Sequence, residues 1–397
     1  MRGVCRMLAV VIAAGGPCVA LAQTIPPSEQ PGRERDRFQQ PTLPRAQPGG
    51  PAVTLPSTVA PPGAAQSKIN IRDIRILGAT VYDSEELIAL SRDLIGRQGS
   101  LQDIYDLAQR ITAKYGNDGY VLSRAIVPPQ QLDPRGSVVH IQVIEGYIDR
   151  VEWPSSLTRY RDFFSSYTAK IIADRPTNVR TIERYILLAS DLPGLKFSTT
   201  LKPSPTNQGA ATLVVDVTEK RIDANARVDN RGTAARGPIQ FLAAATLNNL
   251  FGQHEAFSAT WAAATQLREL EYFAGSYRQV LNSEGLTAFV NASYGYGFPG
   301  TFQLQSLQYN TRSTIVEAGF SYPLVRLRER NLTLTALGFM SDSHSDILSA
   351  PFNEDKLRGF RLKVDADAAD PLGAINQFNV TYSQGIDGLG SVRRQAI

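Results

Sequence analysis

The segment GLTAFVNASYG, at residues 285–295, shows most clearly how the second half of this chain is built. Every second residue from Leu286 to Tyr294 is apolar, and the residues between them are mainly small or polar. This period of two is typical of a β-strand with one apolar and one polar face. Similar segments recur after Arg221, so we predict nine strands in all. They begin near Ile222, Pro238, Glu255, Arg268, Gly285, Thr311, Asn331, Arg358 and Ile375.

The residue types on the two faces indicate where these strands lie. The apolar positions are often Ala, Phe or Tyr, and the alternate positions include Asp, Lys and Arg. A soluble β-sandwich, the competing interpretation, would favour bulky aliphatic side chains on its inner faces. Aromatic residues also stand near strand ends, as they do at the edges of a lipid bilayer. We therefore predict that residues 221–397 form an antiparallel transmembrane β-barrel whose outer face contacts outer-membrane lipid.

Loop lengths predict how such a barrel is oriented. We expect the short turns at 249–255, 279–285 and 369–375 to face the periplasm. The longer segments at 296–310 and 341–357 are expected to be loops that face outward.

An internal repeat precedes the strands. Residues 68–146 are predicted to contain a strand, two helices and two further strands, and residues 147–220 repeat that order. The helix from Leu101 to Tyr115 is the clearest, because its apolar residues recur at three- and four-residue spacing. The last two strands of the first copy are expected at 120–127 and 138–145. The fold class is therefore α+β plus all-β: two tandem β-α-α-β-β domains and then an antiparallel barrel.

The first 67 residues offer no core. Arg2 and Arg6 precede a mostly apolar stretch that ends in Ala20-Leu21-Ala22, so residues 1–22 are predicted to be a cleaved signal peptide. Residues 23–67 are rich in proline, which predicts an extended, disordered linker. The charged segment 33–38 lies between prolines, and we do not expect a stable helix there.

Composition excludes several classes of protein. Both cysteines, Cys5 and Cys18, lie in the predicted signal, so the mature chain has no disulfide and no thiol chemistry. The formal charge of +4 falls to +2 without Arg2 and Arg6, since 39 basic residues then face 37 acidic ones. No basic run marks a nucleic-acid surface.

Motifs that resemble catalytic sites lack their structural context. Residues 295–300 match the dinucleotide-binding glycine pattern, but Pro299 and a Thr/Gln-rich stretch follow where a helix is required. Residues 343–346 combine Ser, His and Asp without the glycines of a nucleophile turn. The three histidines are isolated and have no metal-ligand spacing. We expect no enzymatic activity, cofactor, metal or nucleotide.

The order of these segments resembles that of a known family. A signal, a Pro-rich linker, two β-α-α-β-β domains and alternating strands are similar to the ShlB/FhaC/HecB haemolysin secretion/activation proteins. These are the outer-membrane transporters of two-partner secretion, in the BamA-like superfamily, and the paired domains look like their POTRA (polypeptide-transport-associated) domains. The resemblance runs from about residue 69 to the last residue. Its most specific motifs are Ile74–Gly78, Val143–Ile148, Asp191–Gly194 and, in the barrel, Asp229-Asn230-Arg231-Gly232, followed by Asp370–Gly373 and Ser383–Asp387.

The number of strands departs from the family pattern. The family barrel has roughly sixteen strands and an inward loop with an arginine motif. Nine strands would leave unpaired edges in lipid, so we expect an incomplete, C-terminally truncated barrel that does not form a stable channel. Arg358-Gly359-Phe360 is superficially similar to the loop motif, but it stands at the start of an expected strand.

The resemblance implies a protein partner. POTRA domains of this family recognise an unfolded exoprotein of the haemolysin or adhesin type, which we expect to be encoded nearby. An unfolded client can add to a sheet edge as an extra strand. In the first domain we expect this at the strand 120–127 and the outer face of the preceding helix. A solvated surface is the competing interpretation for these charges. The expected client-binding residues are Asp106, Arg110, Lys114, Tyr120, Leu122 and Arg124.

Three functions remain open on the sequence alone. Secretion of one large exoprotein is favoured by the presence of only two POTRA-like repeats. A BamA-like factor that assembles outer-membrane proteins would share the architecture. A binding or adhesion protein with a plugged lumen is the third possibility.

Overall fold

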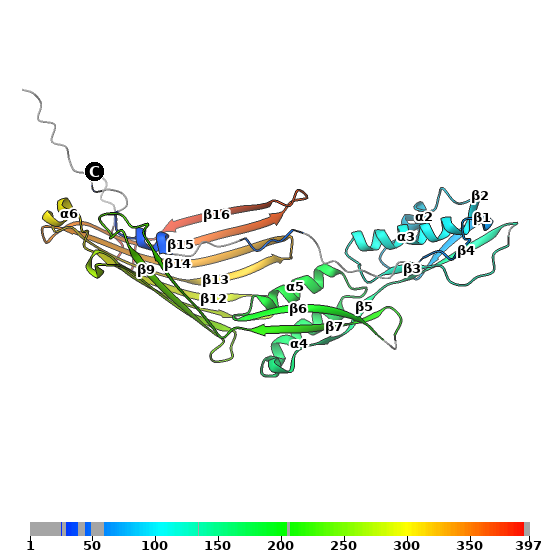
Figure 1. The fold of residues 1–397 in the computed structure, drawn as a ribbon, viewed down its shortest axis with the longest axis horizontal. Coiled ribbons are helices and arrows are strands. Elements are labelled where there is room, and N and C mark those ends of the chain that lie inside the picture. The colour runs from blue at the N-terminus through cyan, green and yellow to red at the C-terminus, as the bar shows by residue number, and fades with distance from the viewer. Residues whose placement is uncertain are drawn as a thin grey trace, which may run out of the picture.

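The structure is a computed structural model that describes residues 25, 29–38, 44–48, 59–133, 135–204 and 207–392, without the side chains of 158–162. Three β-sheets follow one another along an elongated molecule (Figure 1). Two small mixed sheets with helices precede a nine-stranded antiparallel sheet, which confirms the predicted fold class. The expected signal peptide lies outside the described residues. Within the described residues no helix is long and apolar enough to cross a membrane.

The first unit is a four-stranded sheet in the order β2-β1-β4-β3, covered by helices. β1 and β4 run parallel in its centre, as expected for strands joined by a helical crossover. Its elements are β1 (Lys68–Leu77), α2 (Ser84–Ala89), β2 (Arg97–Ser100), α3 (Leu101–Asn117), β3 (Arg124–Ile126) and β4 (Ser137–Ile144).

Two details of this unit correct the prediction. The short strand β2 was not expected, and it forms because residues 97–100 pair with residues 68–71 of β1. The strand expected at 120–127 is only β3, residues 124–126. The backbone before β3 turns instead of extending, because the Tyr120 N–H donates to the Tyr115 carbonyl and the Ser123 N–H donates to the Tyr120 carbonyl.

The predicted amphipathic helix is α3. Its start is fixed by a capping box, in which the Ser100 hydroxyl accepts from the Asp103 N–H and the Asp103 carboxylate accepts from the Ser100 N–H. Ile104, Leu107 and Ile111 are fully buried against the sheet. Burial of three such side chains supplies several kcal/mol at about 1.5–3 kcal/mol each.

Glu145, directly after β4, holds the loop between β1 and α2 in place through hydrogen bonds. Its carboxylate accepts hydrogen bonds from the Thr80 N–H (2.7 Å), the Val81 N–H (3.0 Å), the Thr80 hydroxyl and the Tyr115 hydroxyl (2.7 Å). Burial opposes ionisation of Glu145, but these hydrogen bonds outweigh it and lower its pKa. The bonds therefore favour the ionised carboxylate.

The stability of the protein should depend on pH through Glu145. A carboxyl group whose pKa is lowered by folding stabilises the protein above its unfolded-state pKa of about 4.3, and this contribution is lost as pH falls through the lower folded-state pKa. We expect Glu145→Gln to lower the free energy of unfolding by about 1.5–3 kcal/mol at pH 7, because it weakens hydrogen bonds to a charged group. The difference from the unmodified protein should shrink towards pH 3. Thermal unfolding at each pH measures it, with the exposed Glu85→Gln as control; a difference that does not change with pH would contradict the assignment.

The second unit has the predicted order of strands and α-helices, with one additional 3-10 helix. Its three-stranded sheet has the order β5-β7-β6, with β5 parallel and β6 antiparallel to the central β7. One side chain from the third sheet, Val280, belongs to its apolar core. The elements are β5 (Tyr147–Glu152), the 3-10 helix η2 (Ser155–Tyr160), α4 (Arg161–Ala173), α5 (Val179–Ser190), β6 (Leu195–Pro203) and β7 (Ala210–Glu219).

The nine predicted strands of the second half are confirmed. They form one sheet in sequence order, and the strands at its ends, β8 and β16, do not pair with each other. The strands are β8 (Ile222–Asp229), β9 (Gln240–Asn248), β10 (Glu255–Ala264), β11 (Glu271–Val280), β12 (Thr287–Gly297), β13 (Asn310–Arg326), β14 (Arg330–Ile347), β15 (Ala350–Ala369) and β16 (Ile375–Gly385). Between them lie the 3-10 helix η3 (Leu267–Glu269) and α6 (Phe302–Ser306).

The loop expected at 341–357 is strand instead. Pairing between β14 and β15 continues from Ser341 opposite Leu357 out to Ile347 opposite Ala350. The chain reverses at Leu348 and Ser349, which both have positive φ values. Most side chains along this extension are polar, so the sequence shows little apolar alternation there and suggested a loop. The Ser, His and Asp residues at 343–346 are part of β14.

The two faces of this sheet differ as predicted. Large apolar side chains of neighbouring strands are exposed on one face, such as Trp261 opposite Phe273 and Phe273 opposite Tyr294. The alternate residues carry polar groups on the other face, for example Ser258 opposite Ser276 and Ser276 opposite Asn291. We call the second one the polar face.

Candidate functional site

A short helix, α1 (Arg33–Phe38), lies against the polar face of the nine-stranded sheet (Figure 1). No stable helix was expected in this proline-rich segment, so that part of the prediction is wrong. Helix α1 is only six residues long, and such a short helix is not stable by itself. Contacts with residues from the sheet and its connecting loops, far away in the sequence, therefore hold it.

The first of these contacts is a pair of charges. Both terminal guanidinium nitrogens of Arg35 contact the carboxylate of Glu317 in β13, at 3.1 and 2.6 Å. Arg361 of β15 contacts the same carboxylate at 2.8 Å. The Glu317 side chain is only 3% exposed, and two arginines compensate its burial.

The second contact is apolar. Phe38 is buried at the end of α1 with its ring centroid 5.4 Å from that of Tyr272. Leu242, Ala262 and Leu270 complete the apolar cluster around Phe38. Helix α1 is thus positioned at one end by a charge pair and at the other by an aromatic contact.

The third contact centres on Arg236, in the loop between β8 and β9. Its guanidinium contacts the Glu29 carboxylate at 2.9 Å, the Glu34 carboxylate at 3.3 Å and the Thr311 hydroxyl at 2.9 Å. It also donates to the Glu29 main-chain carbonyl at 3.0 Å. The Arg236 side chain is 5% exposed, so these are buried ionic contacts.

The glycine pattern at 295–300 is explained by this arginine. A Cβ atom at Gly297 would lie 2.0 Å from a guanidinium nitrogen of Arg236, so only glycine leaves room for it. A Cβ atom at Gly300 would similarly lie 2.2 Å from the Glu269 carboxylate. The two glycines serve close packing around the site of α1, and residues 295–297 belong to strand β12 rather than to the loop that the sequence suggested.

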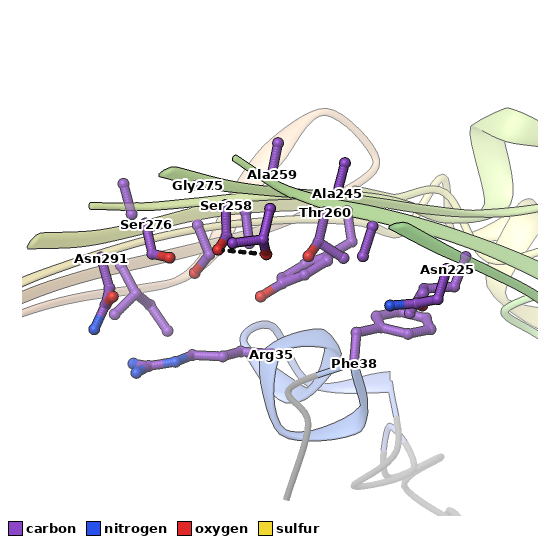
Figure 2. Close-up of a pocket in the computed structure, with 18 of the residues that line it drawn as sticks. Arg35, Phe38, Asn225, Ala245, Ser258, Ala259, Thr260, Gly275, Ser276 and Asn291 are labelled. Atoms are coloured by element: carbon purple, nitrogen blue, oxygen red, sulfur yellow. Dashed lines mark hydrogen bonds between the residues drawn. The ribbon is translucent and has the colours of Figure 1, made fainter. Parts of the chain in front are cut away.

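A cavity of about 350 Å³ lies between α1 and strands β8–β13. Figure 2 shows Arg35 and Phe38 projecting from α1 towards the sheet, and the side chains of Thr260 and Asn291 projecting from the sheet towards α1. Other polar side chains around it come from the same face: Asn225, Thr246, Ser258, Ser276 and Ser293. The lining therefore combines small polar groups with apolar side chains such as Leu242 and Ile315 and with the charged Asp223 and Glu317.

The barrel motif Asp229-Asn230-Arg231-Gly232 stands at the end of β8, beside α1. The Asp229 carboxylate accepts from the Arg231 N–H at 3.1 Å and lies 3.7 Å from the guanidinium of Arg37 in α1. The Gly232 N–H donates to the Pro238 carbonyl at 3.1 Å. The motif therefore shapes the loop that carries Arg236, and it contacts α1 directly.

A chain of polar contacts links the second unit, the sheet and the N-terminal segment. We call it the rim network. Asp191, at the end of α5, pairs with Arg326 of β13 through two bonds of 2.7 and 2.9 Å. Arg326 contacts Asn331 of β14 at 3.0 Å, and Asn331 contacts Asp367 of β15 at 2.9 Å. The Asp367 carboxylate accepts from the Ala46 N–H at 2.6 Å, so it also anchors the segment that follows α1.

The six residues expected to bind a client do not form one continuous surface. Asp106 and Arg110 are exposed on α3, and Arg110 lies 3.5 Å from Asp93. Lys114 is occupied by Glu86 (2.8 Å), Asp118 (3.3 Å) and the ring of Tyr82. Its hydrogen bond to Glu86, with that to Asp118, raises the pKa of Lys114 despite some desolvation.

The other three expected client-binding residues come from the segment after α3. Tyr120 packs on the core of the first unit, whereas Leu122 packs on the core of the second unit. Arg124 begins β3. The binding role of all six residues stays a prediction.

The functional residues around α1 were missed by sequence reasoning. Arg35 lies 282 residues from Glu317 and Arg236 lies 207 residues from Glu29, and no local pattern relates residues so far apart. The only available signal was the isolated charged hexapeptide at 33–38 with Phe38 at its end.

Comparison with known proteins shows which proteins this chain resembles. Residues 69–146 match the family described as POTRA domain, ShlB-type. The heme/hemopexin transporter protein HuxB of Haemophilus influenzae is 23% identical over 84% of this chain and 59% of its own length. The outer membrane transporter CdiB of Dickeya dadantii is 25% identical over 81% of this chain and 57% of its own length. The chain thus spans little more than half the length of these relatives.

Solved structures support the same fold. CdiB from Escherichia coli superposes with a TM-score of 0.62 at 17% identity, over 92% of this chain and 66% of that one. CdiB from Acinetobacter baumannii gives 0.51 at 14% identity, over 89% and 68%. The chain is thus similar in sequence to transporter proteins and in fold to CdiB. The ShlB-type match of its first unit agrees with the resemblance that the sequence motifs indicated.

Proposed function

We propose that this chain is the outer-membrane transporter of a two-partner secretion system, which binds an unfolded exoprotein in the periplasm and passes it across the outer membrane. The observation that carries this proposal is the pairing of two POTRA-type units with a sheet that is apolar on one face and polar on the other. On this proposal residues 1–22 direct export, the apolar face contacts lipid, and the polar face lines the passage.

Helix α1 would then occupy the passage in the resting protein. Its ion pairs with Glu317 and Arg236 are specific but reversible, because each joins charged groups that water can solvate again. An extended client could take the place of α1 on the polar face, where small hydroxyl and amide side chains accept many sequences.

The strand β6 is the edge on which we propose that the client is recognised. It has nine residues, borders the second sheet, and pairs only with β7. Strand addition uses main-chain hydrogen bonds and so tolerates many client sequences. The exposed Asp106 and Arg110 of the first unit would add side-chain contacts farther along the client.

The direction of each main-chain group of β6 follows from its neighbours. The Lys220 N–H donates to the Gly194 carbonyl, and the Ser204 N–H donates to the Ala210 carbonyl. The main-chain groups of the even-numbered residues 194 and 204 therefore point to β7. Because this direction alternates along a strand, odd-numbered residues such as Thr199 direct their N–H and C=O to the free edge.

Replacing Thr199 by proline should therefore impair secretion without breaking the sheet. Proline removes the free N–H on which an added strand would pair, while the β6–β7 hydrogen bonds remain. We expect secretion of the exoprotein encoded beside this gene to fall at least about tenfold, the loss of one or two hydrogen bonds. Thr199→Val keeps the N–H and should secrete normally. Immunoblotting of the culture medium measures both; equal secretion by the two variants would refute recognition at β6.

A further inference from the structure

Three other edges of the two small sheets carry hydrogen bonds from side chains. In the first unit, β4 has eight residues but only residues 142–144 pair with β3. The edge of β4 beyond β3 would be open to an added strand. The side chain of Gln130 occupies it instead: its amide oxygen accepts from the His140 N–H and its amide nitrogen donates to the His140 carbonyl, both at 2.8 Å.

Gln130 thus reproduces the bonding of one strand residue. An adjacent strand satisfies both main-chain groups of every second residue, and the Gln130 amide does this for His140. His140 precedes the paired residues Gln142 and Ile144 by even steps, so all three direct these groups to the same edge. The Gln130 amide lies opposite His140, in the position that the next hydrogen-bonding residue of β3 would take if that strand were longer.

The outer edge of β3 is also occupied. The Ala125 N–H, in the middle of this three-residue strand, donates to the Thr112 hydroxyl of α3 at 2.9 Å. In the second unit, the outward N–H of Ile148 in β5 donates to the Thr177 hydroxyl at 3.0 Å. The Tyr147 N–H points the opposite way, towards the Gly209 carbonyl, which confirms the outward direction at Ile148.

We infer that Gln130, Thr112 and Thr177 determine where on the two small sheets a client can be recognised, by closing three of their edges to strand addition so that β6 is left for it. This inference rests on the proposed function only for the choice of β6; the closing of the edges is a property of these three side chains. The remaining edge of the two small sheets in the described residues, β2, has four residues, which is short for strand addition.

Opening an edge should create a new binding position. In Gln130→Ala both main-chain groups of His140 lose their partner, and Thr112→Val removes the acceptor of the Ala125 N–H while keeping the side-chain shape. Gln131→Ala is the matched control, since Gln131 is the exposed neighbour of the same type. The probe is a fluorescent decapeptide of alternating threonine and valine, added to the full chain in detergent.

Two measurements test the inference. Without peptide, amide hydrogen exchange within residues 137–144 should be about tenfold faster in Gln130→Ala than in Gln131→Ala, the loss expected for one hydrogen bond. With peptide, the same residues should become protected again in Gln130→Ala, and the Ala125 amide should gain protection in Thr112→Val. Within the two small sheets, the unmodified protein and Gln131→Ala should show peptide protection only at residues 195–203.

The outcomes separate this inference from the proposal on β6. Peptide protection of residues 137–144 in the unmodified protein, or no difference between Gln130→Ala and Gln131→Ala, would overturn the inference. Protection of 137–144 in Gln130→Ala combined with no protection of β6 in any variant would support closed edges and refute recognition at β6. If Gln130→Ala folds poorly, hydrogen exchange of the Ala125 amide in Thr112→Val tests the inference independently.

Discussion

Replacing Arg236 by alanine should release α1 from the polar face of the sheet. The substitution leaves the carboxylates of Glu29 and Glu34 in a buried site without their common positive partner. Removing one partner of a buried ion pair costs about 3–5 kcal/mol, and here it also removes hydrogen bonds to Thr311 and to the Glu29 carbonyl. The bound position of α1 would then be disfavoured by at least about a hundredfold.

Trypsin provides the measurement, because α1 carries Arg33, Arg35 and Arg37. These sites are protected while α1 contacts the sheet, and in Arg236→Ala we expect cleavage at them to be at least about a hundredfold faster. Arg312→Ala is the matched control, since Arg312 is 56% exposed and its contact with Asp346 is worth little. Unchanged cleavage of Arg236→Ala would mean that Arg236 does not hold α1.

Replacing Asp191 by alanine should uncouple the second unit from the nine-stranded sheet. The Arg326 guanidinium, whose side chain is 8% exposed, would lose both oxygens of its partner. The expected cost is again about 3–5 kcal/mol, because a buried positive charge is left without compensation. Arg326 would relax away from Asn331, and through Asn331 the position of Asp367 would change.

The effect should therefore reach the N-terminal segment, which Asp191 contacts only through Arg45 at 3.4 Å. We expect hydrogen exchange of the Ala46 amide to accelerate about tenfold or more, together with faster exchange at the end of α5. Asp216→Ala, at an exposed position of β7, should leave both unchanged. Faster exchange in α5 without any change at Ala46 would show that the rim network does not extend to the N-terminal segment.

Periodicity was sufficient for most of the fold. Alternation placed all nine strands of the large sheet, and three- and four-residue spacing placed α3, because both patterns arise from burial of one face of a regular element. The strand at 120–127 was overestimated because its residues pack on two different cores, so their apolar character does not reflect extended backbone. The extension of β14 and β15 past residue 341 was missed, since mostly polar side chains carry no such signal.

The site could not be predicted in the same way. Contacts such as Arg35 with Glu317 join residues 282 positions apart, and only the curvature and register of the sheet bring them together. The Pro-rich composition around α1 correctly indicated that the segment has no core of its own, but the core that it uses belongs to β9–β11. The glycines at 297 and 300 were visible as a pattern, whereas their role depended on the position of Arg236 and Glu269.

The position of α1 also constrains the order of events during folding. Residues 29–38 are synthesised before any strand of the sheet on which they rest, and their contacts with Arg236 and Glu317 span 207 and 282 residues. Pairing between neighbouring strands is local by comparison, so the hairpins can form first. The early segment must therefore remain unattached until the late strands arrive, and until then it is accessible to proteases and to other chains. A chaperone that shields this segment would raise the yield of assembled protein without touching the sheet.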